Sequence, residues 1–383
     1  MNIVVAMDSF KGSLSSLQAG QAVREGALRA IPSAEVAVRP LADGGEGTVE
    51  ALAAGLGGRL RRVTVEGPLG DPVESAYGIL PDGCTAVVEM SAAAGLPLVD
   101  PARRDPLRAT TYGVGQVLRD AMEQGCRRFI VGIGGSATND GGAGMLQALG
   151  YAFLDEQGRP IAPGAAGLAD LHTISAAHVL PQLAECRFRV ACDVTNPLCG
   201  PQGCSAVYGP QKGATPAMIG QMDGWLARYA QLAARLYPGK ADPEFPGSGA
   251  AGGMGFAFLT FTDAVLESGI DIVLAETRLA DFLREADLVV TGEGRLDGQT
   301  AMGKAPVGVA RLAKQYGKPV IAFAGSVTPD AAACNDRGID AFFPALRQVC
   351  TLDEAMDPDT ARRSLTAAAE QAFRLWQTAK SCP

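Results

Sequence analysis

The chain has 383 residues, of which 47% are hydrophobic and 19% are charged, and its formal net charge is −8. This composition supplies enough apolar material for packed cores and excludes a globally disordered chain, and the length favours two domains over one. The acidic balance disfavours a nucleic-acid-binding protein, which would carry a basic face, so an anionic ligand would have to be held by backbone amides and a few basic side chains.

The first elements alternate between apolar strands and helices. A strand at residues 3–6 is followed by the polar turn DSFKGSLS at 8–15 and by a helix through 19–29. A second strand at 35–38 leads into the glycine-rich segment ADGGEGT at 42–48. This alternation is typical of a parallel α/β sheet.

The middle of the chain has a different pattern. Three β-rich segments, at 62–65, 73–80 and 86–89, follow one another without long helices between them. Such a succession favours antiparallel or mixed pairing. Further strands are predicted at 128–133 and 187–191.

The C-terminal region returns to the first pattern. A strand that begins at Asp287 runs into a glycine-rich loop, and a helix with Pro306 in its first turn covers 305–314. Another strand is predicted at 319–325.

Because both chain ends share one pattern, we expect an α/β fold of two domains. Residues 1–70 and 285–383 would form a discontinuous Rossmann-like domain with a parallel sheet. Residues 71–284 would form a second, mixed-sheet α/β domain inserted in the middle.

The cysteines and the N-terminus both predict a cytoplasmic protein. The nine cysteines are an odd number without a C-x-x-C pair, so we expect reduced thiols. The chain enters its first strand without a basic leader, and no apolar run approaches the length of a membrane span. We expect neither a nucleic-acid nor a membrane partner, and a homo-oligomer is compatible with the sequence.

Glycine is frequent, at 48 residues, and it is clustered. The clusters at 43–47, 132–144, 249–255 and 292–298 each follow a predicted strand or precede a predicted helix. At such places backbone N–H groups and the helix dipole can meet a phosphate or a carboxylate, and in open α/β sheets these sites gather at the carboxyl ends of strands. The pattern predicts a site that handles phosphate.

Two known phosphate-binding fingerprints fit this chain poorly. The segment GIGGSAT from Gly132 lacks the G-x-G-x-x-G spacing of dinucleotide-binding folds. The segment GQTAMGKA at 298–305 ends in Ala305, where a P-loop has a metal-binding Ser or Thr. Lys304 nevertheless lies at the entrance of the helix that Pro306 begins.

Acid–base chemistry in this chain falls to carboxylates, because the only two histidines, His172 and His178, lie in a region rich in Leu, Ala and Val that suits packing or surface roles. Six acidic residues lie at predicted strand ends or helix starts: Asp8, Asp43, Asp140, Asp193, Glu293 and Asp297. Helix capping is an equal alternative for Asp8 and Asp140, whereas no helix follows Asp193. Carboxylates beside a phosphate cradle suit Mg2+ binding and the acceptance of a proton from an attacking hydroxyl.

Four basic residues, Lys11, Lys212, Arg295 and Lys304, fall in glycine-rich loops rather than on amphipathic helices. Phosphoryl transfer needs positive charge where the equatorial oxygens accumulate negative charge. Lys11, Arg295 and Lys304 are the candidates for this role.

Taken together, these loops resemble the bacterial type I glycerate kinase family. The matching segments occur in the family's order and spacing from near residue 3 to beyond residue 325, and GGSATNDGG and GEGRLDGQT are the most specific of them. The segments are DSFKGSLS (8–15), ADGGEGT (42–48), ATTYGVG (109–115), VGIGGSATNDGGAG (131–144), NPL (196–198), GPQKGA (209–214), AAGG (250–253), GEGRLDGQT (292–300) and GKAP (303–306).

The resemblance implies ATP-dependent phosphorylation of D-glycerate with Mg2+, generally to 2-phosphoglycerate, on a two-domain α/β fold with one domain inserted in the other. The cleft between the two domains is the expected site, because motifs from both are needed. Cys204 stands where the family pattern leads us to expect Ala, which leaves the assignment intact.

The roles within the site are hypotheses that rest on chemistry. Lys11 is expected to contact the transferring phosphate, and Arg295 and Lys304 to clamp the remaining anion. Either Asp43 or Asp193 is expected to hold Mg2+ or to accept the glycerate proton. Glu89, at a strand end, is a further candidate. The residues expected to bind substrate or phosphate are Ser9, Gly44, Gly45, Gly134, Gly135, Ser136, Asp140, Glu293, Asp297 and Lys304.

Two other functions stay open at this point. The same loops would serve a kinase of another small hydroxy acid, such as hydroxypyruvate or tartronate, or one that phosphorylates the 3-hydroxyl. A non-catalytic sensor of a phosphorylated metabolite is the alternative from another class. The acidic loop residues count against a sensor, because carboxylates around an anion weaken its binding.

Overall fold

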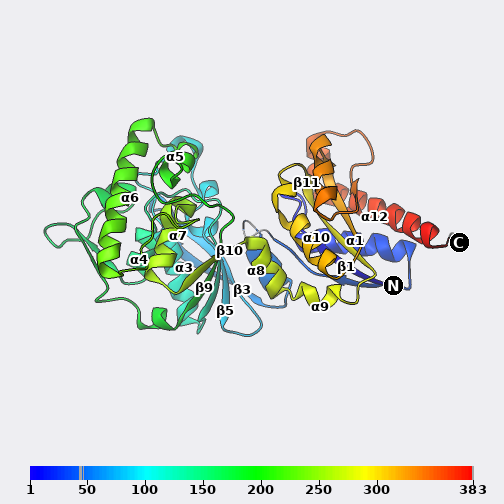
Figure 1. Ribbon diagram of the computed structural model, residues 1–383, viewed down its shortest axis with the longest axis horizontal. Helices are drawn as coiled ribbons and strands as arrows, with labels where there is room; N and C mark the ends of the chain where they lie inside the picture. Colours follow the sequence, from blue (N-terminus) through cyan, green and yellow to red (C-terminus); the bar gives the residue numbers. More distant parts are fainter. Residues whose placement is uncertain (43–44, 46, 382–383) are drawn as a thin grey trace. The chain divides into compact units, whose positions relative to one another are not determined.

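The computed structural model describes residues 1–42, 45 and 47–381. The chain divides into two compact units (Figure 1). The first comprises Met1–Asp43, Glu50–Leu56 and Ile270–Pro383, and the second comprises Gly44–Val49 and Gly57–Gly269.

The first unit is built on a five-stranded sheet in the order β13-β12-β11-β1-β2. All its strand pairs are parallel, with Ile3 of the inner strand β1 level with Leu288 of β11 on one side and Val36 of β2 on the other. The strands are β1 (Asn2–Met7), β2 (Glu35–Val38), β11 (Leu288–Leu296), β12 (Val320–Val327) and β13 (Ala341–Pro344). The apolar, β-branched runs of β1 and β11 are buried, as expected for inner strands of a parallel sheet.

Helices from both chain ends pack together in this unit. Helix α1 (Ser16–Ala30) and helix α12 (Pro358–Ser381) lie side by side (Figure 1) and share one core with Ile3, Val5 and Met7 of β1. The remaining helical segments are the π-helical turn η1 (Glu50–Ala54), α8 (Gly269–Glu276), α9 (Leu279–Leu283), the 3-10 turn η7 (Thr300–Met302), α10 (Ala305–Gln315), the 3-10 segment η8 (Pro329–Arg337) and α11 (Leu352–Met356).

The second unit is built on a six-stranded sheet in the order β10-β9-β6-β5-β4-β3. Strands β3 (Arg59–Glu66), β4 (Pro72–Ile79) and β5 (Thr85–Glu89) pair antiparallel. Strands β5, β6 (Arg128–Gly132), β9 (Arg187–Ala191) and β10 (Ala264–Glu267) pair parallel. A separate antiparallel pair consists of β7 (Ala152–Leu154) and β8 (Thr173–Ser175).

The helices of the second unit enclose an aromatic-rich core. Phe129 of β6 stacks on Phe188 of β9 with ring centroids 4.9 Å apart, and Tyr229 and Phe258 are buried beside them in the same core. The helical segments are α2 (Ser91–Ala94), η2 (Leu96–Leu98), η3 (Pro101–Arg103), α3 (Tyr112–Glu123), α4 (Ala143–Ala148), η4 (Ala165–Ala169), η5 (Pro181–Glu185), α5 (Cys204–Tyr208), η6 (Pro210–Lys212), α6 (Pro216–Leu236) and α7 (Ala250–Phe261).

The predicted fold class is confirmed, with a parallel sheet made from both chain ends and a mixed sheet from the middle. The joins between the units differ from the expected 70 and 284. Strand β3 already belongs to the mixed sheet, because its whole length pairs with β4, and the chain returns to the first unit from Ile270. Local patterns do not show which sheet a strand will join, since that depends on its distant partner.

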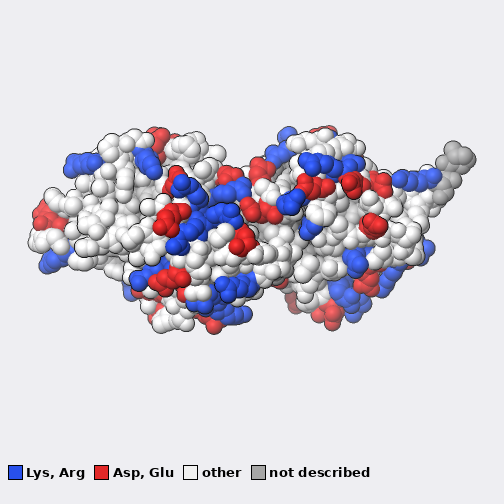
Figure 2. All heavy atoms as spheres, turned by 90° about the horizontal axis from the view of Figure 1, so that it is seen from below, with Lys and Arg blue, Asp and Glu red and all other residues white. Residues whose placement is uncertain are grey.

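Within the described residues, no helix is long and apolar enough to cross a membrane. The eight cysteines in this part of the chain are all free thiols. On the face drawn in Figure 2, acidic and basic side chains are interspersed. Many charged side chains of the described residues form ion pairs, such as Arg61 with Asp120 and Arg189 with Glu267.

Candidate active site

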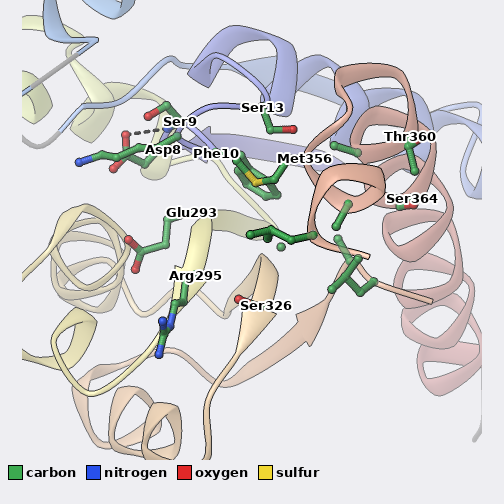
Figure 3. A pocket seen from close by; sticks show the side chains of 18 of the residues that line it. Asp8, Ser9, Phe10, Ser13, Glu293, Arg295, Ser326, Met356, Thr360 and Ser364 are labelled. Atoms are coloured by element: carbon green, nitrogen blue, oxygen red, sulfur yellow. Dashed lines mark hydrogen bonds between the residues drawn. The ribbon is translucent and has the colours of Figure 1, made fainter. Parts of the chain in front are cut away.

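The first unit contains a cavity of about 400 Å³ at the carboxyl edge of its parallel sheet. Its walls come from the segments after β1 and β13, from the ends of β11 and β12, and from α11 and α12 (Figure 3). The lining residues are Asp8, Ser9, Phe10, Lys11, Ser13, Glu293, Gly294, Arg295, Asp297, Lys304, Gly325, Ser326, Ala345, Leu346, Leu352, Ala355, Met356, Thr360, Ala361 and Ser364. Ligands of open α/β folds bind at this edge of the sheet.

The turn after β1 forms one wall of the cavity. The backbone N–H of Asp8 donates to the carbonyl of Gly292 (2.8 Å), and the Asp8 carboxylate accepts from the N–H of Ser9 (2.7 Å). The N-cap of α1 is Ser15, whose hydroxyl accepts from the N–H of Gln18. The capping alternative for Asp8 is therefore wrong, and its carboxylate lies in the cavity wall. Lys11 is exposed at the same wall.

The end of β11 and the loop after it carry the facing charged groups. Figure 3 shows Glu293 and Arg295 projecting on the same side of β11, as residues two apart on a strand must. Glu293 is 8% exposed, and its carboxylate accepts a hydrogen bond from the hydroxyl of Thr300. The Arg295 Nε atom lies 3.7 Å from Oδ2 of Asp297. The other Asp297 oxygen, Oδ1, accepts from the N–H of Thr300 and thereby shapes the loop.

Lys304 completes the charged part of the cavity. It occupies the N-cap position of α10, and Pro306 lies in the first turn of that helix, as predicted. Three basic side chains and three carboxylates therefore line one cavity: Lys11, Arg295 and Lys304, with Asp8, Glu293 and Asp297.

The second unit gathers its own candidates at the carboxyl edge of the parallel part of its sheet. Glu89 ends β5, residues 134–136 follow β6, and Asp193 follows β9, and these three strands are neighbours in the sheet. The Glu89 carboxylate accepts a hydrogen bond from the N–H of Val49 (2.7 Å).

Gly45 and Gly134, from two of the predicted glycine bends, lie close together in this second unit. A Cβ added at Gly134 would come within 3.8 Å of the Cα of Gly45. Gly135 has a φ of +72°, which a glycine adopts readily, and Ser136 is buried. Asp43 and Gly44 lie outside the described residues.

Asp193 is exposed, and its Oδ1 accepts a hydrogen bond from the backbone N–H of Gly269 (3.1 Å). Gly269 is the first residue of α8, so the carboxylate meets a helix start that lies far along the chain. The sequence shows no helix next to Asp193 because this contact joins segments 76 residues apart.

Asp140 lies in the interior of the second unit. Its carboxylate is fully buried and accepts hydrogen bonds from the N–H groups of Thr111, Gly142 and Gly144 and from the hydroxyl of Thr111. Burial raises the pKa of Asp140, and these hydrogen bonds oppose the rise. These hydrogen bonds hold the backbone of the glycine-rich loop. A buried carboxylate that accepts backbone N–H groups resembles the capping alternative more than a ligand-binding group.

Lys212 makes a buried contact with the same loop. Its side chain is 1% exposed, and its Nζ donates to the backbone carbonyl of Thr138 (2.6 Å). Burial lowers the pKa of Lys212 to about 8. The sequence placed this lysine in a glycine-rich loop, but its burial depends on contacts that sequence patterns do not reveal.

Sequence reasoning missed the wall of the cavity that α11 and α12 supply. Met356, Thr360 and Ser364 carry no glycine or charge motif. The available signal was the T-x-x-E capping box at Thr351 and Glu354, which starts a helix shortly after β13 and so at the carboxyl edge of the sheet.

The donor set of the cavity suits Mg2+ held together with a phosphorylated ligand. No group of three His, Cys, Asp or Glu side chains that could hold a metal ion occurs in the described part of the chain. Mg2+ is commonly bound through one or two carboxylates, water and phosphate oxygens rather than by a cage of protein ligands. Asp8, Glu293 and Asp297 offer such carboxylates in the first unit, and Glu89 and Asp193 offer them in the second.

The comparisons with known proteins all lead to the same family and cover nearly the whole chain. A family model described as the glycerate kinase family matches residues 3–377. Glycerate 2-kinase of Escherichia coli K12 is 49% identical over 355 residues, covering 93% of each chain, and glycerate kinase of Bacillus cereus is 42% identical over 99% of each chain. The crystal structure of "putative glycerate kinase 2" from Salmonella typhimurium LT2 is 47% identical, with a TM-score of 0.92 over 99% of both chains.

Proposed function

Because the chain belongs to the glycerate kinase family, we propose that it transfers the γ-phosphoryl group of ATP to D-glycerate and releases 2-phosphoglycerate and ADP. The observation that carries this proposal is the cavity of the first unit, in which three basic side chains and three carboxylates meet at the carboxyl edge of a parallel sheet. Phosphoryl transfer depends mainly on positioning and electrostatic stabilisation, and this set of groups supplies both.

The basic side chains have the first role. During transfer, negative charge spreads over the equatorial oxygens of the phosphoryl group, and fixed cations stabilise that charge. We assign this role to Lys11 and Arg295, with Lys304 holding another phosphate. The N–H of Ser9, which bonds the Asp8 carboxylate, fixes the turn that carries Lys11.

The carboxylates have the second role. We propose that Asp193 and Asp43 share the tasks of holding Mg2+ and accepting the proton of the glycerate hydroxyl. Mg2+, when bound, would neutralise phosphate charge beside these carboxylates. Residues 134–136 present a glycine-rich backbone with two exposed glycines, which suits an anionic group such as the glycerate carboxylate.

The position of phosphorylation is proposed by analogy with the relative from Escherichia coli, whose name specifies a 2-kinase. A kinase of another hydroxy acid would use the same groups, and a sensor of phosphorylated metabolites would use the basic ones. The three carboxylates in the cavity favour a kinase over a sensor, because they oppose binding of a bare anion and suit Mg2+.

A coupled assay of ADP release tests the proposal. Purified protein with ATP and Mg2+ is given D-glycerate, L-glycerate, hydroxypyruvate or tartronate, and kcat/KM is compared. We expect D-glycerate to have the highest value. A higher value for another acid would reassign the substrate, and tight binding of phosphorylated ligands without ATP turnover would favour the sensor.

A further inference from the structure

The cavity of the first unit has two chemically different halves. In Figure 3, Asp8, Glu293 and Arg295 lie on one side, which we call the charged half. The other half is walled by apolar side chains from the turn after β1 and from residues 346–361: Phe10, Leu346, Leu352, Ala355, Met356 and Ala361. A ligand that fills the whole cavity must therefore be apolar at one end and charged or strongly polar at the other.

The apolar half is held in place by contact between the β1 turn and α11. A Cβ added at Gly12 would come within 2.9 Å of the Met356 methyl carbon, and Gly12 has a φ of +77°. Figure 3 shows Met356 next to Phe10, which is itself 5% exposed. Gly294 and Gly325 also line the cavity and carry no side chains, and a Cβ at Gly294 would come within 3.3 Å of the Cα of Phe10.

Apolar surface remains exposed at the rim of this half. Leu352 is 75% exposed and Leu346 is 39% exposed, although both line the cavity. Hydroxyl groups of Thr360, Ser364 and Ser326 lie among the apolar residues and can orient a ligand by hydrogen bonds. A few polar groups within a mainly apolar wall are typical of pockets for ring-containing small molecules.

D-glycerate does not match this half of the cavity. It is a three-carbon acid in which every carbon bears oxygen, so it has no apolar face to bury. A volume of about 400 Å³ also falls in the range of pockets that enclose larger ligands. A nucleotide has both required ends, because its base is a flat ring system with a large apolar face and its phosphates are anionic.

We infer that this cavity is the nucleotide site of the chain, with the base against Met356 and Phe10 and the phosphates toward Lys11, Arg295 and Lys304. This inference rests on the proposed kinase function for the choice of a nucleotide over another anionic ring compound. It assigns the base to the wall formed by α11 and α12.

Binding of ADP and of pyrophosphate, measured by isothermal titration calorimetry, separates the two ends of the ligand. For Met356→Ala we expect the ADP affinity to fall about tenfold, because apolar contact with the base is lost. The pyrophosphate affinity should stay within about twofold of the wild-type value. Lys304→Ala should weaken both ligands to a similar degree.

Two further variants provide a second test of the apolar half and a control. Leu352→Ser changes a side chain that is three-quarters exposed, so it leaves the fold intact, and it should weaken ADP but not pyrophosphate. Leu375→Ala removes an exposed leucine on α12 that does not line the cavity, and it should change neither affinity.

The inference is overturned if Met356→Ala and Leu352→Ser leave ADP affinity unchanged, or weaken pyrophosphate as much as ADP. It is also overturned if these variants weaken D-glycerate binding and spare ADP. Failure of the proposed function gives a different result: wild-type protein would bind ADP more tightly than pyrophosphate, with the base effect intact, and yet would not phosphorylate D-glycerate.

Discussion

The hydroxyl of Thr300 donates a hydrogen bond to the carboxylate of Glu293, and both side chains are buried at the charged half of the cavity. Thr300 also donates its backbone N–H to Asp297, so one residue contacts two of the three cavity carboxylates. The motif GEGRLDGQT therefore folds back on itself, and its threonine holds the acidic groups in place.

Thr300→Val tests this positioning role, because valine keeps the shape and removes the hydroxyl. We expect a loss of about 1–3 kcal/mol in the free energy of unfolding, since the buried Glu293 carboxylate loses a donor. We also expect a fall of roughly tenfold in kcat. Thr300→Ser restores the hydroxyl and should recover most of both losses. Equal kcat values for the valine and serine variants would contradict the role.

Lys11→Ala tests the proposed contact with the transferring phosphate. Removing a cation that stabilises the transition state should lower kcat by roughly a hundredfold or more. The matched control is Lys318→Ala, because Lys318 lies just before β12, at the opposite end of that strand from the cavity. If the Lys11 variant keeps a near-normal kcat, Lys11 is an ordinary surface lysine.

Asp193→Asn tests the proposed role in Mg2+ binding or proton acceptance. The asparagine oxygen can still accept the hydrogen bond from Gly269, so the fold should be retained. Loss of the negative charge should lower kcat by roughly a hundredfold. Asp263→Asn is the control. Asp263 precedes β10 and so lies at the amino edge of the parallel strands, whereas Asp193 follows β9 at their carboxyl edge, and Asp263 makes an exposed ion pair with Arg187. A full rate in the Asp193 variant would move both tasks to Asp43 or another carboxylate.

Lys212 should make the stability of the protein depend on pH. Its pKa is about 8 in the folded chain, below the ordinary 10.5, so between these values the unfolded chain holds a proton that the folded chain has released. Stability then rises with pH through this range, whereas below about pH 8 the full cost of burying the charge is present.

Comparison with Lys212→Met isolates this effect. The free energy of unfolding in urea, taken as wild type minus variant, should increase by about 1 kcal/mol between pH 7 and pH 9. A difference that stays constant or decreases over this range would show that Lys212 does not release its proton in the folded state.

Local sequence patterns predicted the parts of this molecule that depend on neighbouring residues. The strand at 3–6 and the helix at 19–29 lie within β1 and α1, and the turn between them lines the cavity as the mixture of Asp8 and Lys11 indicated. Glycine-rich bends occur at the carboxyl ends of strands because glycine can adopt the backbone angles that a sharp turn requires there.

The remainder depends on contacts between distant residues. Asp140 and Asp193 both look like loop carboxylates in the sequence. In the structure, Asp140 is buried and accepts four hydrogen bonds, whereas Asp193 is exposed and accepts one from Gly269. The apolar wall from α11 and α12 joins the cavity through Met356 and its approach to Gly12 in the β1 turn. The capping box predicts where α11 starts, but a contact between such distant segments is not visible in local patterns.

The most direct test of the central claim is NMR of the product formed from D-glycerate, ATP and Mg2+. The account predicts a new 31P resonance split into a doublet by the single proton on C2, with 13C–31P coupling at C2 in labelled glycerate. A triplet from the two protons on C3 would contradict phosphorylation at the 2-hydroxyl. The absence of any phosphate ester would contradict the kinase itself.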